Sequence, residues 1–372
     1  MRFDVSSTAL LSRLQSISKV IASKNSLPIL DSFLFDLDGN KLTITASDAE
    51  TRLVTSVEVM NSKGTGLFAV SAKILLDPEL PEQPLTFDIN DENLEIFIHF
   101  QNGKYNFIGQ KGDTYPLQKP LNDNAIAIIV DSQMLLNGIS RSLFATADDE
   151  LRPVMNGIYF DIHTDDLTFV ASDGHKLVRL RNLSVKSPER ASFILPKKPA
   201  NLLKNLLGKE TEMVNIKFDD NNAYVNCANF EMVCRLIEGR YPNYNSVIPQ
   251  ENPFKVTIDR ISFLNALKRV SVFSNPASSL VKLQLKESEM VVSAQDIDFS
   301  TSAEEKIVCQ FDGTELNIGF KATYLIEILS NINSEEVILE LADPSRAGLI
   351  VPAENEENED QLMLLMPMML ND

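Results

Sequence analysis

Residues 254–271 read FKVTIDRISFLNALKRVS, a strand-like alternation of apolar and polar side chains that passes through Asp259 into apolar positions at helical spacing. Residues 2–18 (RFDVSSTALLSRLQSIS) and 127–144 (AIIVDSQMLLNGISRSLF) follow the same pattern. In each, a Ser or Asp precedes the helix, where its side chain can accept a hydrogen bond from the first turn. The apolar helical positions are Leu10, Leu11, Leu14, Leu135, Leu136, Ile139, Phe263, Leu264 and Leu267. One strand-to-helix unit therefore occurs three times.

Two further markers keep the same period. A tripeptide ending in Asp follows an apolar run in each copy, and the three tripeptides start 125 and 123 residues apart. They are Ala46-Ser47-Asp48, Ala171-Ser172-Asp173 and Ala294-Gln295-Asp296. Another set of strand-then-helix segments begins at Phe68, Phe193 and Leu316, at the same intervals. Because solenoid and propeller repeats span only about 20–50 residues, each copy is expected to be a whole domain.

The pattern predicts an α+β protein of three repeated domains, each with antiparallel sheets and two helices. The predicted domains are residues 1–121, 122–249 and 250–372. The predicted helical segments are 6–24, 71–80, 131–146, 197–209, 259–275 and 321–333, of which 71–80 is expected to be only a turn or two. Hairpin turns are predicted at Asp38–Asn40, Asp219–Asn222 and Lys286–Glu289, where turn-forming residues separate alternating segments.

Composition narrows the class of protein. The 372 residues are 44% hydrophobic, yet no stretch approaches the run of apolar residues that a membrane span needs, and the N-terminal residues lack the apolar core of a signal peptide. Three cysteines without CxxC spacing suggest neither a disulfide framework nor a zinc site. We therefore expect a reduced, cytoplasmic protein with no membrane partner.

The charge is unevenly distributed. The net formal charge is −18, which by itself argues against binding to nucleic acid. The six predicted helical segments nevertheless carry +8 together, leaving −26 for the remainder. If the helices share one face, they would attract phosphates there. The alternative, that Lys and Arg simply suit helices while Asp collects in turns, remains open at this point.

Five segments resemble the bacterial sliding clamps, the beta subunit of DNA polymerase III. They are ASDGHKLVRL (171–180), EGRYPNYNSVIP (238–249), LMLLMPMML (362–370), SLPIL (26–30) and LRPVMNGIYF (151–160). The resemblance covers all three repeats. It implies DNA-clamp domains in a head-to-tail homodimeric ring, with sheets outside and helices lining a hole for duplex DNA. It further implies a non-enzymatic processivity factor for DNA replication, without a cofactor.

The resemblance implies a pocket between the second and third domains for short partner peptides. The expected partners are the DNA polymerase III alpha subunit, the clamp loader, other polymerases and repair proteins. The matching positions are Met155, Ser172, Gly174, His175, Lys176, Leu177, Pro242, Val247, Tyr324, Leu364, Met366, Pro367, Met368 and Met369. Methionine suits such a lining, because its flexible thioether can repack around different anchors.

Two further sets of residues carry over by resemblance. Contacts to DNA phosphates, without sequence specificity, are expected from Lys24, Arg152, Lys197 and Lys198. Apolar contacts at the dimer seam are expected from Phe107, Val272 and Phe273.

The chain departs from the family pattern at three places. Asp149 stands where a polar DNA-contacting residue is common, so the 149–154 loop is not expected to contribute strongly. Ser246 and Met369 stand where many relatives have Arg, which predicts a less basic end of the pocket and an altered preference among peptides.

Catalysis and metal binding are not expected. Ser172, Asp173 and His175 lie on a strand-like stretch, where neighbouring side chains point to opposite faces and cannot converge as a catalytic triad. The three histidines form no metal-binding motif. The acidic run 354–360 is interpreted as a solvated loop. The alternatives that remain are an enzyme with an unrecognised site and a scaffold that binds only proteins.

Overall fold

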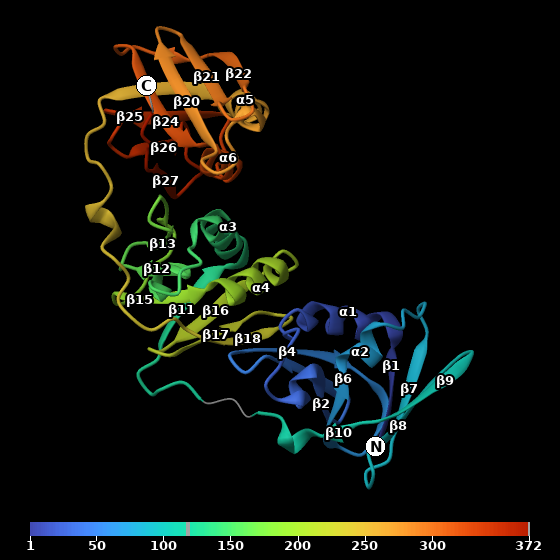
Figure 1. The fold of residues 1–372 in the computed structure, drawn as a ribbon. Helices are drawn as coiled ribbons and strands as arrows, with labels where there is room; N and C mark the ends of the chain where they lie inside the picture. The colour runs from blue at the N-terminus through green and yellow to red at the C-terminus, as the bar shows by residue number, and fades with distance from the viewer. Residues whose placement is uncertain (117–119, 371–372) are drawn as a thin grey trace. The chain divides into compact units, whose positions relative to one another are not determined.

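The computed structural model describes residues 1–116 and 120–370 (Figure 1). These residues form two compact units. The first unit contains the described residues within 1–135 and residues 201–236, and the second contains residues 136–200 and the described residues from Ile237 onward. Within the described residues there are six α-helices. They are α1 (Ser7–Ser18), α2 (Ala72–Leu76), α3 (Ser132–Ser142), α4 (Lys197–Leu207), α5 (Arg260–Val270) and α6 (Ala322–Ser330).

The first unit has two antiparallel sheets. The five-stranded sheet runs in the order β5 (Met60–Lys63), β1 (Arg2–Ser6), β7 (Pro84–Ile89), β8 (Glu95–Phe100), β9 (Gly103–Ile108). The nine-stranded sheet runs β10 (Gln110–Lys111), β6 (Gly66–Ser71), β2 (Ser32–Asp38), β3 (Lys41–Ser47), β4 (Thr51–Glu58), β18 (Glu231–Arg235), β17 (Asn222–Asn226), β16 (Met213–Phe218), β11 (Ile126–Asp131). It joins five strands of the first repeat to four of the second through β4 and β18.

The second unit repeats this plan. Its nine-stranded sheet runs β15 (Ala191–Pro196), β12 (Gly157–Ile162), β13 (Leu167–Ser172), β14 (Lys176–Asn182), β27 (Glu359–Leu365), β26 (Gly348–Pro352), β25 (Glu336–Leu341), β19 (Phe254–Asp259), β23 (Gln310–Phe311). It joins the second repeat to the third through β14 and β27. The four-stranded sheet runs β22 (Thr301–Val308), β21 (Glu289–Asp296), β20 (Leu280–Lys286), β24 (Leu316–Lys321).

The repeated tripeptides form one repeated turn. The carboxylates of Asp48, Asp173 and Asp296 each accept hydrogen bonds from the backbone N–H groups two and three residues later, at 2.7 to 3.3 Å. Such Asx turns hold the hairpins β3–β4, β13–β14 and β21–β22. The prediction of three repeated α+β units is confirmed.

The helices form where the sequence predicts them, but they are shorter. Ser6 caps α1 through a 3.1 Å bond from the backbone N–H of Ala9, and Asp259 caps α5 through a 2.7 Å bond from Ser262. Helix α1 ends at Ser18, so Lys24 lies in the irregular segment beyond it. The second helix of the first repeat is only the five-residue α2, as expected.

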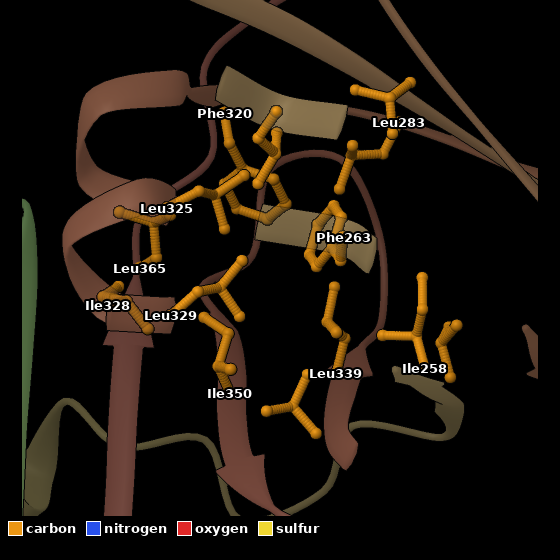
Figure 2. Close-up of a cluster of buried hydrophobic side chains, with 14 of the residues drawn as sticks. Ile258, Phe263, Leu283, Phe320, Leu325, Ile328, Leu329, Leu339, Ile350 and Leu365 are labelled. Carbon is orange, nitrogen blue, oxygen red and sulfur yellow. The ribbon is translucent and has the colours of Figure 1, made fainter. Parts of the chain in front are cut away.

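The core of the third repeat lies between its helices and both sheets of its unit. Figure 2 shows Leu325, Ile328 and Leu329 of α6 in one buried cluster with Phe263 of α5 and Phe320 of β24. Each of these five side chains is at most 1% exposed. Full burial of a side chain of this size stabilises a fold by about 1.5–3 kcal/mol. The paired helices α5 and α6 therefore hold this repeat together (Figure 1).

The three predicted hairpins are also present. Asp38 pairs with Lys41, Phe218 with Ala223, and Lys286 with Glu289. The first needs a left-handed residue in its tight turn, and Gly39 supplies it with φ +56°. None of the helices in the described chain has the length and apolar character needed to cross a membrane.

Candidate functional site

Several residues of the predicted pocket lie where β14 meets β27, within the second unit. Lys176 faces Leu365 and Leu177 faces Leu364 in an antiparallel ladder. The ladder continues past β27, because the backbone N–H of Met366 donates to the carbonyl of His175 at 2.8 Å. The turn before β14 and the C-terminal methionines are thus held side by side by main-chain bonds.

One face of this ladder is apolar. Leu177 and Leu364, each 4% exposed, belong to a buried cluster with Tyr241, Tyr244 and Ile248. The segment 241–248, which contains these three residues, also contains Pro242 and Val247, and both of these are exposed. Val247 is 56% exposed and Met155, on the same unit, is 7% exposed. Val247 is therefore exposed next to Ile248 of this buried cluster.

The opposite face carries Lys176, because neighbouring residues of a strand point to opposite sides. Lys176 is only 5% exposed. Its Nζ lies 2.6 Å from Oε2 of Glu327 and 4.3 Å from the centre of the Tyr324 ring. The ring of His175 stacks on Tyr324 at 6.2 Å, and Nζ of Lys321 lies 4.7 Å from the same ring. The charge of Lys176 is therefore paired within the protein, whereas the His175 side chain is exposed.

The C-terminal segment is anchored to β24. The N–H of Met368 donates to the carbonyl of Gly319 at 2.8 Å. A Cβ at position 319 would lie 2.7 Å from the Met368 carbonyl oxygen, so glycine is needed for this approach. Met366 and Met369 are 41% and 78% exposed, whereas Pro367 and Met368 are half-buried. Two flexible thioethers are thus exposed just beyond the end of β27.

Ser172 and Asp173 shape the turn. The Ser172 hydroxyl donates to the Lys176 carbonyl at 2.9 Å and accepts from the N–H of Gly174 at 3.1 Å. The Asp173 carboxylate is taken up by the Asx turn described above. Gly174 has φ +92°, and a Cβ there would lie 2.9 Å from Nη1 of Arg152. Both Ser172 and Asp173 are engaged with the backbone, which agrees with the rejection of a catalytic triad.

The expected DNA-contacting residues lie in different surroundings. In the first unit, Lys24 is exposed. In the second, Lys198 is exposed, Lys197 Nζ lies 2.7 Å from Oδ2 of Asp148, and Arg152 Nε lies 2.8 Å from Oδ2 of Asp149. The hydrogen bond from Arg152 also lowers the pKa of the Asp149 carboxyl below its ordinary value. At least two of the four expected cations, Lys197 and Arg152, therefore already hold carboxylates.

The residues of the predicted dimer seam lie on exposed edges. Phe107 lies on β9, which within the described chain has a strand neighbour on one side only. Val272 and Phe273 lie in a short 3₁₀ turn (Ser271–Phe273) and are 76% and 41% exposed. This turn packs on β21 and β22, and β22 is likewise an edge strand in the described residues.

Sequence reasoning missed an ion-pair cluster in the second unit. Arg141 on α3, with a side chain 13% exposed, donates to Glu356 at 2.8 Å and to Glu359 at 2.7 Å. The interpretation of residues 354–360 as a solvated loop is therefore wrong for these two glutamates. Burial raises the pKa of Glu359 in spite of the neighbouring Arg141. The only sequence signal was a lone arginine on an otherwise uncharged helix beyond its cap.

The described residues contain no side-chain grouping of the kind that holds a metal ion. Among residues 1–116 and 120–370, no three His, Cys, Asp or Glu side chains group closely enough to hold a metal ion. The cysteines Cys227, Cys234 and Cys309 are buried and unpaired by disulfides.

Comparison with known proteins matches the whole chain to one family. Models of the DNA polymerase III beta subunit match residues 1–119 (N-terminal domain), 129–243 (central domain) and 245–369 (C-terminal domain). The beta sliding clamp of Pseudomonas aeruginosa is 27% identical over 373 residues, covering 100% of both chains. That of Bacillus subtilis is 25% identical, covering 98% of this chain and 99% of the relative.

Solved structures of similar proteins share the fold. The crystal structure of a DNA polymerase sliding clamp from Pseudomonas aeruginosa with ligand superposes with a TM-score of 0.92 at 26% identity. Another, of the DNA polymerase III subunit beta from the same organism bound to griselimycin, gives 0.94 at 25% identity. Both comparisons cover 100% of each chain.

Proposed function

The chain belongs to the DNA polymerase III beta subunit family, the bacterial sliding clamps, and from this premise we propose that two copies close head to tail into a ring around duplex DNA. Its function is that of a DNA sliding clamp, which tethers the replicative polymerase for processive synthesis. It is an accessory subunit without catalytic activity of its own. Its three clamp domains would be residues 1–121, 122–249 and 250–372, and it would act in the cytoplasm.

The proposal of a dimer rests on the number of strands in the four sheets. Each nine-stranded sheet joins five strands of one repeat to four of another. The remaining sheets have five and four strands, and their edge strands β9 and β22 correspond to the joining strands of the closed junctions. Pairing β9 of one copy with β22 of a second would make a nine-stranded sheet of the same kind. Two such contacts close a ring of two copies.

The repeats also give the alignment of β22. Arg52 on β4 and Ser302 on β22 occupy the same place, because each faces the residue just before the turn-forming aspartate. Two residues further along, Val54 therefore corresponds to Glu304.

The alignment of β9 follows in the same way. Glu231 on β18 and Lys104 on β9 each face the residue five positions earlier in their hairpins. At the closed junction Glu231 faces Val54. The same register between two copies places Lys104 of one copy opposite Glu304 of the other, and opposite charges directly across a sheet are favourable.

Apolar contacts fit the same arrangement. An apolar groove in the first unit is lined by residues that include Ile74 and Tyr105. Phe107 lies two residues after Tyr105 on β9, and therefore on the same face of the strand. The exposed Val272 and Phe273 of a second copy would fill this groove. Burying two such side chains contributes about 3–6 kcal/mol, so this contact supplies a large part of the dimer affinity.

The partner-binding surface is the apolar site at the β14–β27 junction. A short peptide with apolar anchors would lie against Val247, Leu177 and Leu364, with Met366 and Met369 adjusting to its side chains. The DNA polymerase III alpha subunit, the clamp loader, other polymerases and repair proteins would compete for it. Because Lys176 is held by Glu327 and Ser246 is uncharged, recognition would rest on apolar contacts.

Topological retention on DNA is the test. The protein is loaded by a clamp loader onto nicked circular DNA, the circle is then linearised, and release is followed at moderate salt. A ring stays on the circle and slides off the linear form. No retention on the circle, with an active loader and an intact dimer, would point instead to a scaffold that binds only proteins.

A further inference from the structure

The loop from Asp148 to Asn156 is rigidly built around Asp149. The side-chain amide of Asn156 donates to the Asp149 carbonyl at 3.0 Å, and its oxygen accepts from the Asp149 N–H at 2.9 Å. Oδ1 of Asp149 accepts from the N–H of Leu151 at 2.8 Å. These bonds leave Oδ2 of Asp149 directed at Arg152.

Each of the two aspartates in this loop holds one cation. Asp149 Oδ2 accepts from Arg152 Nε at 2.8 Å, and the Arg152 guanidinium also donates to the Asp173 carbonyl at 3.3 Å. Asp148 Oδ2 lies 2.7 Å from Nζ of Lys197, the first residue of α4. The Asp148 side chain is 82% exposed, so this pair stands at the surface, where phosphate can reach it.

We propose that Asp148 and Asp149 act as internal competitors of DNA phosphate for Lys197 and Arg152, and so weaken the grip of this clamp on the duplex. The inference rests on the proposed function, since it takes these cations to face DNA. A phosphate that approaches Lys197 or Arg152 must displace a carboxylate and meets its negative charge. Fewer counterions are then released on binding, and both affinity and salt dependence fall.

The physical effect is a looser contact at one place on the ring. Exposed ion pairs are weak, so phosphate can displace them transiently. Retention does not suffer, because a closed ring does not depend on tight phosphate contacts. Weak contacts without base readout let the protein move along DNA.

Asparagine substitutions test the proposal without changing side-chain shape. The Asp148→Asn, Asp149→Asn double variant keeps the oxygen that accepts from Leu151 and loses both charges. Binding of the full-length protein to a short fluorescent duplex is measured by anisotropy at several low salt concentrations. We expect about tenfold tighter binding, and a steeper slope of log K against log salt by up to about 2, since each added phosphate contact contributes about 0.9.

Two controls separate a local effect from general charge. Asp165 pairs with Lys186 at 3.5 Å, both highly exposed, on the same unit, and Asp165→Asn should change affinity far less. In a Lys197→Ala background, the gain from Asp148→Asn should disappear. An equal gain from Asp165→Asn, or a gain that persists without Lys197, would overturn the proposal.

Substitutions of Lys24 and Lys198 distinguish failure of the competition proposal from failure of the proposed DNA contacts. If Lys24→Ala with Lys198→Ala weakens binding while the double asparagine variant leaves it unchanged, the DNA contacts stand and the competition is refuted. If none of these lysine substitutions weakens binding, the proposed DNA-contacting face itself is wrong.

Discussion

The β4–β18 junction of the first unit and the β14–β27 junction of the second share a backbone plan but present different surfaces. At the first, Arg52 lies where Leu177 lies at the second, since each faces the serine before its Asx turn. The Arg52 guanidinium donates to the Pro116 carbonyl at 3.4 Å, and burial lowers its pKa. Tyr115 is 2% exposed, and burial raises its pKa to about 12.

The same fold thus carries buried polar and aromatic side chains in one place and the proposed docking surface in the other. In the first unit, polar and aromatic side chains occupy the ladder face at the junction. In the second, Leu177 and Leu364 of the corresponding strands belong to a buried apolar cluster, while Val247, Met366 and Met369 outside these strands are exposed. A repeated backbone therefore sets where a site can form, and a few side chains decide whether it does.

The largest expected effect on folding stability concerns Arg141, whose ion pairs lie in the second unit. Arg141→Ala leaves Glu356 and Glu359 without their cation, one of them largely buried. Removing one partner of a buried pair typically costs about 3–5 kcal/mol. We expect a loss near the lower end, because Glu356 is partly exposed. Chemical denaturation should show the transition of the second unit moving to lower denaturant.

The control for Arg141 is Lys186→Ala. Lys186 pairs with Asp165 at the surface of the same unit, and such exposed pairs contribute about 0–1 kcal/mol. Equal destabilisation by the two variants would show that the Arg141 pairs contribute no more than a surface contact.

The second prediction concerns the open counterpart of these junctions, the edges β9 and β22. Replacing Val272 and Phe273 by glutamate should weaken the dimer at least about 100-fold, because about 3–6 kcal/mol of apolar burial is lost. Sedimentation measures this directly. Ile129→Glu is the matched control, since Ile129 is 62% exposed on the edge strand β11 outside the proposed seam. A stable dimer in the double variant would refute the seam.

The third prediction concerns the docking surface of the second junction. Deleting residues 366–372 should weaken binding of a labelled peptide from the polymerase alpha subunit by at least about tenfold, because the adaptable methionines are lost. The dimer should persist, since the seam lies elsewhere. Met60→Ala, at an exposed methionine of the first unit, should leave peptide binding unchanged. Retained affinity in the truncation would contradict the pocket assignment.

The sequence predicted what local patterns control. Three repeats, six helical segments and the hairpins at Asp38–Asn40, Asp219–Asn222 and Lys286–Glu289 follow from spacing, capping residues and turn-forming residues. It could also have separated Lys176 from Leu177, because strand alternation places them on opposite faces. It could not pair Arg141 with Glu359, or Lys197 with Asp148, because such contacts join residues distant in the chain and depend on packing. The charge count over the helices therefore left out carboxylates that pair with helix cations, as Asp148 does with Lys197.

The smallest expected effect concerns the two Asx turns, one before β4 in the first unit and one before β14 in the second. Ala49 and Gly174 occupy the same place in the two Asx turns, with φ of +87° and +92°. Side chains other than glycine are strained there, so Ala49→Gly should stabilise the first unit by about 0.5–1 kcal/mol, after allowing for the greater chain entropy of glycine when unfolded. Gly174→Ala should destabilise the second unit by about 1 kcal/mol or more, because it adds strain and brings a Cβ to 2.9 Å from Arg152 Nη1. Denaturation midpoints that shift in opposite directions would show that the two turns bear the same backbone constraint, and that only the second has resolved it with glycine. Shifts in the same direction would show that the surroundings of the turns, rather than their shared geometry, set the cost.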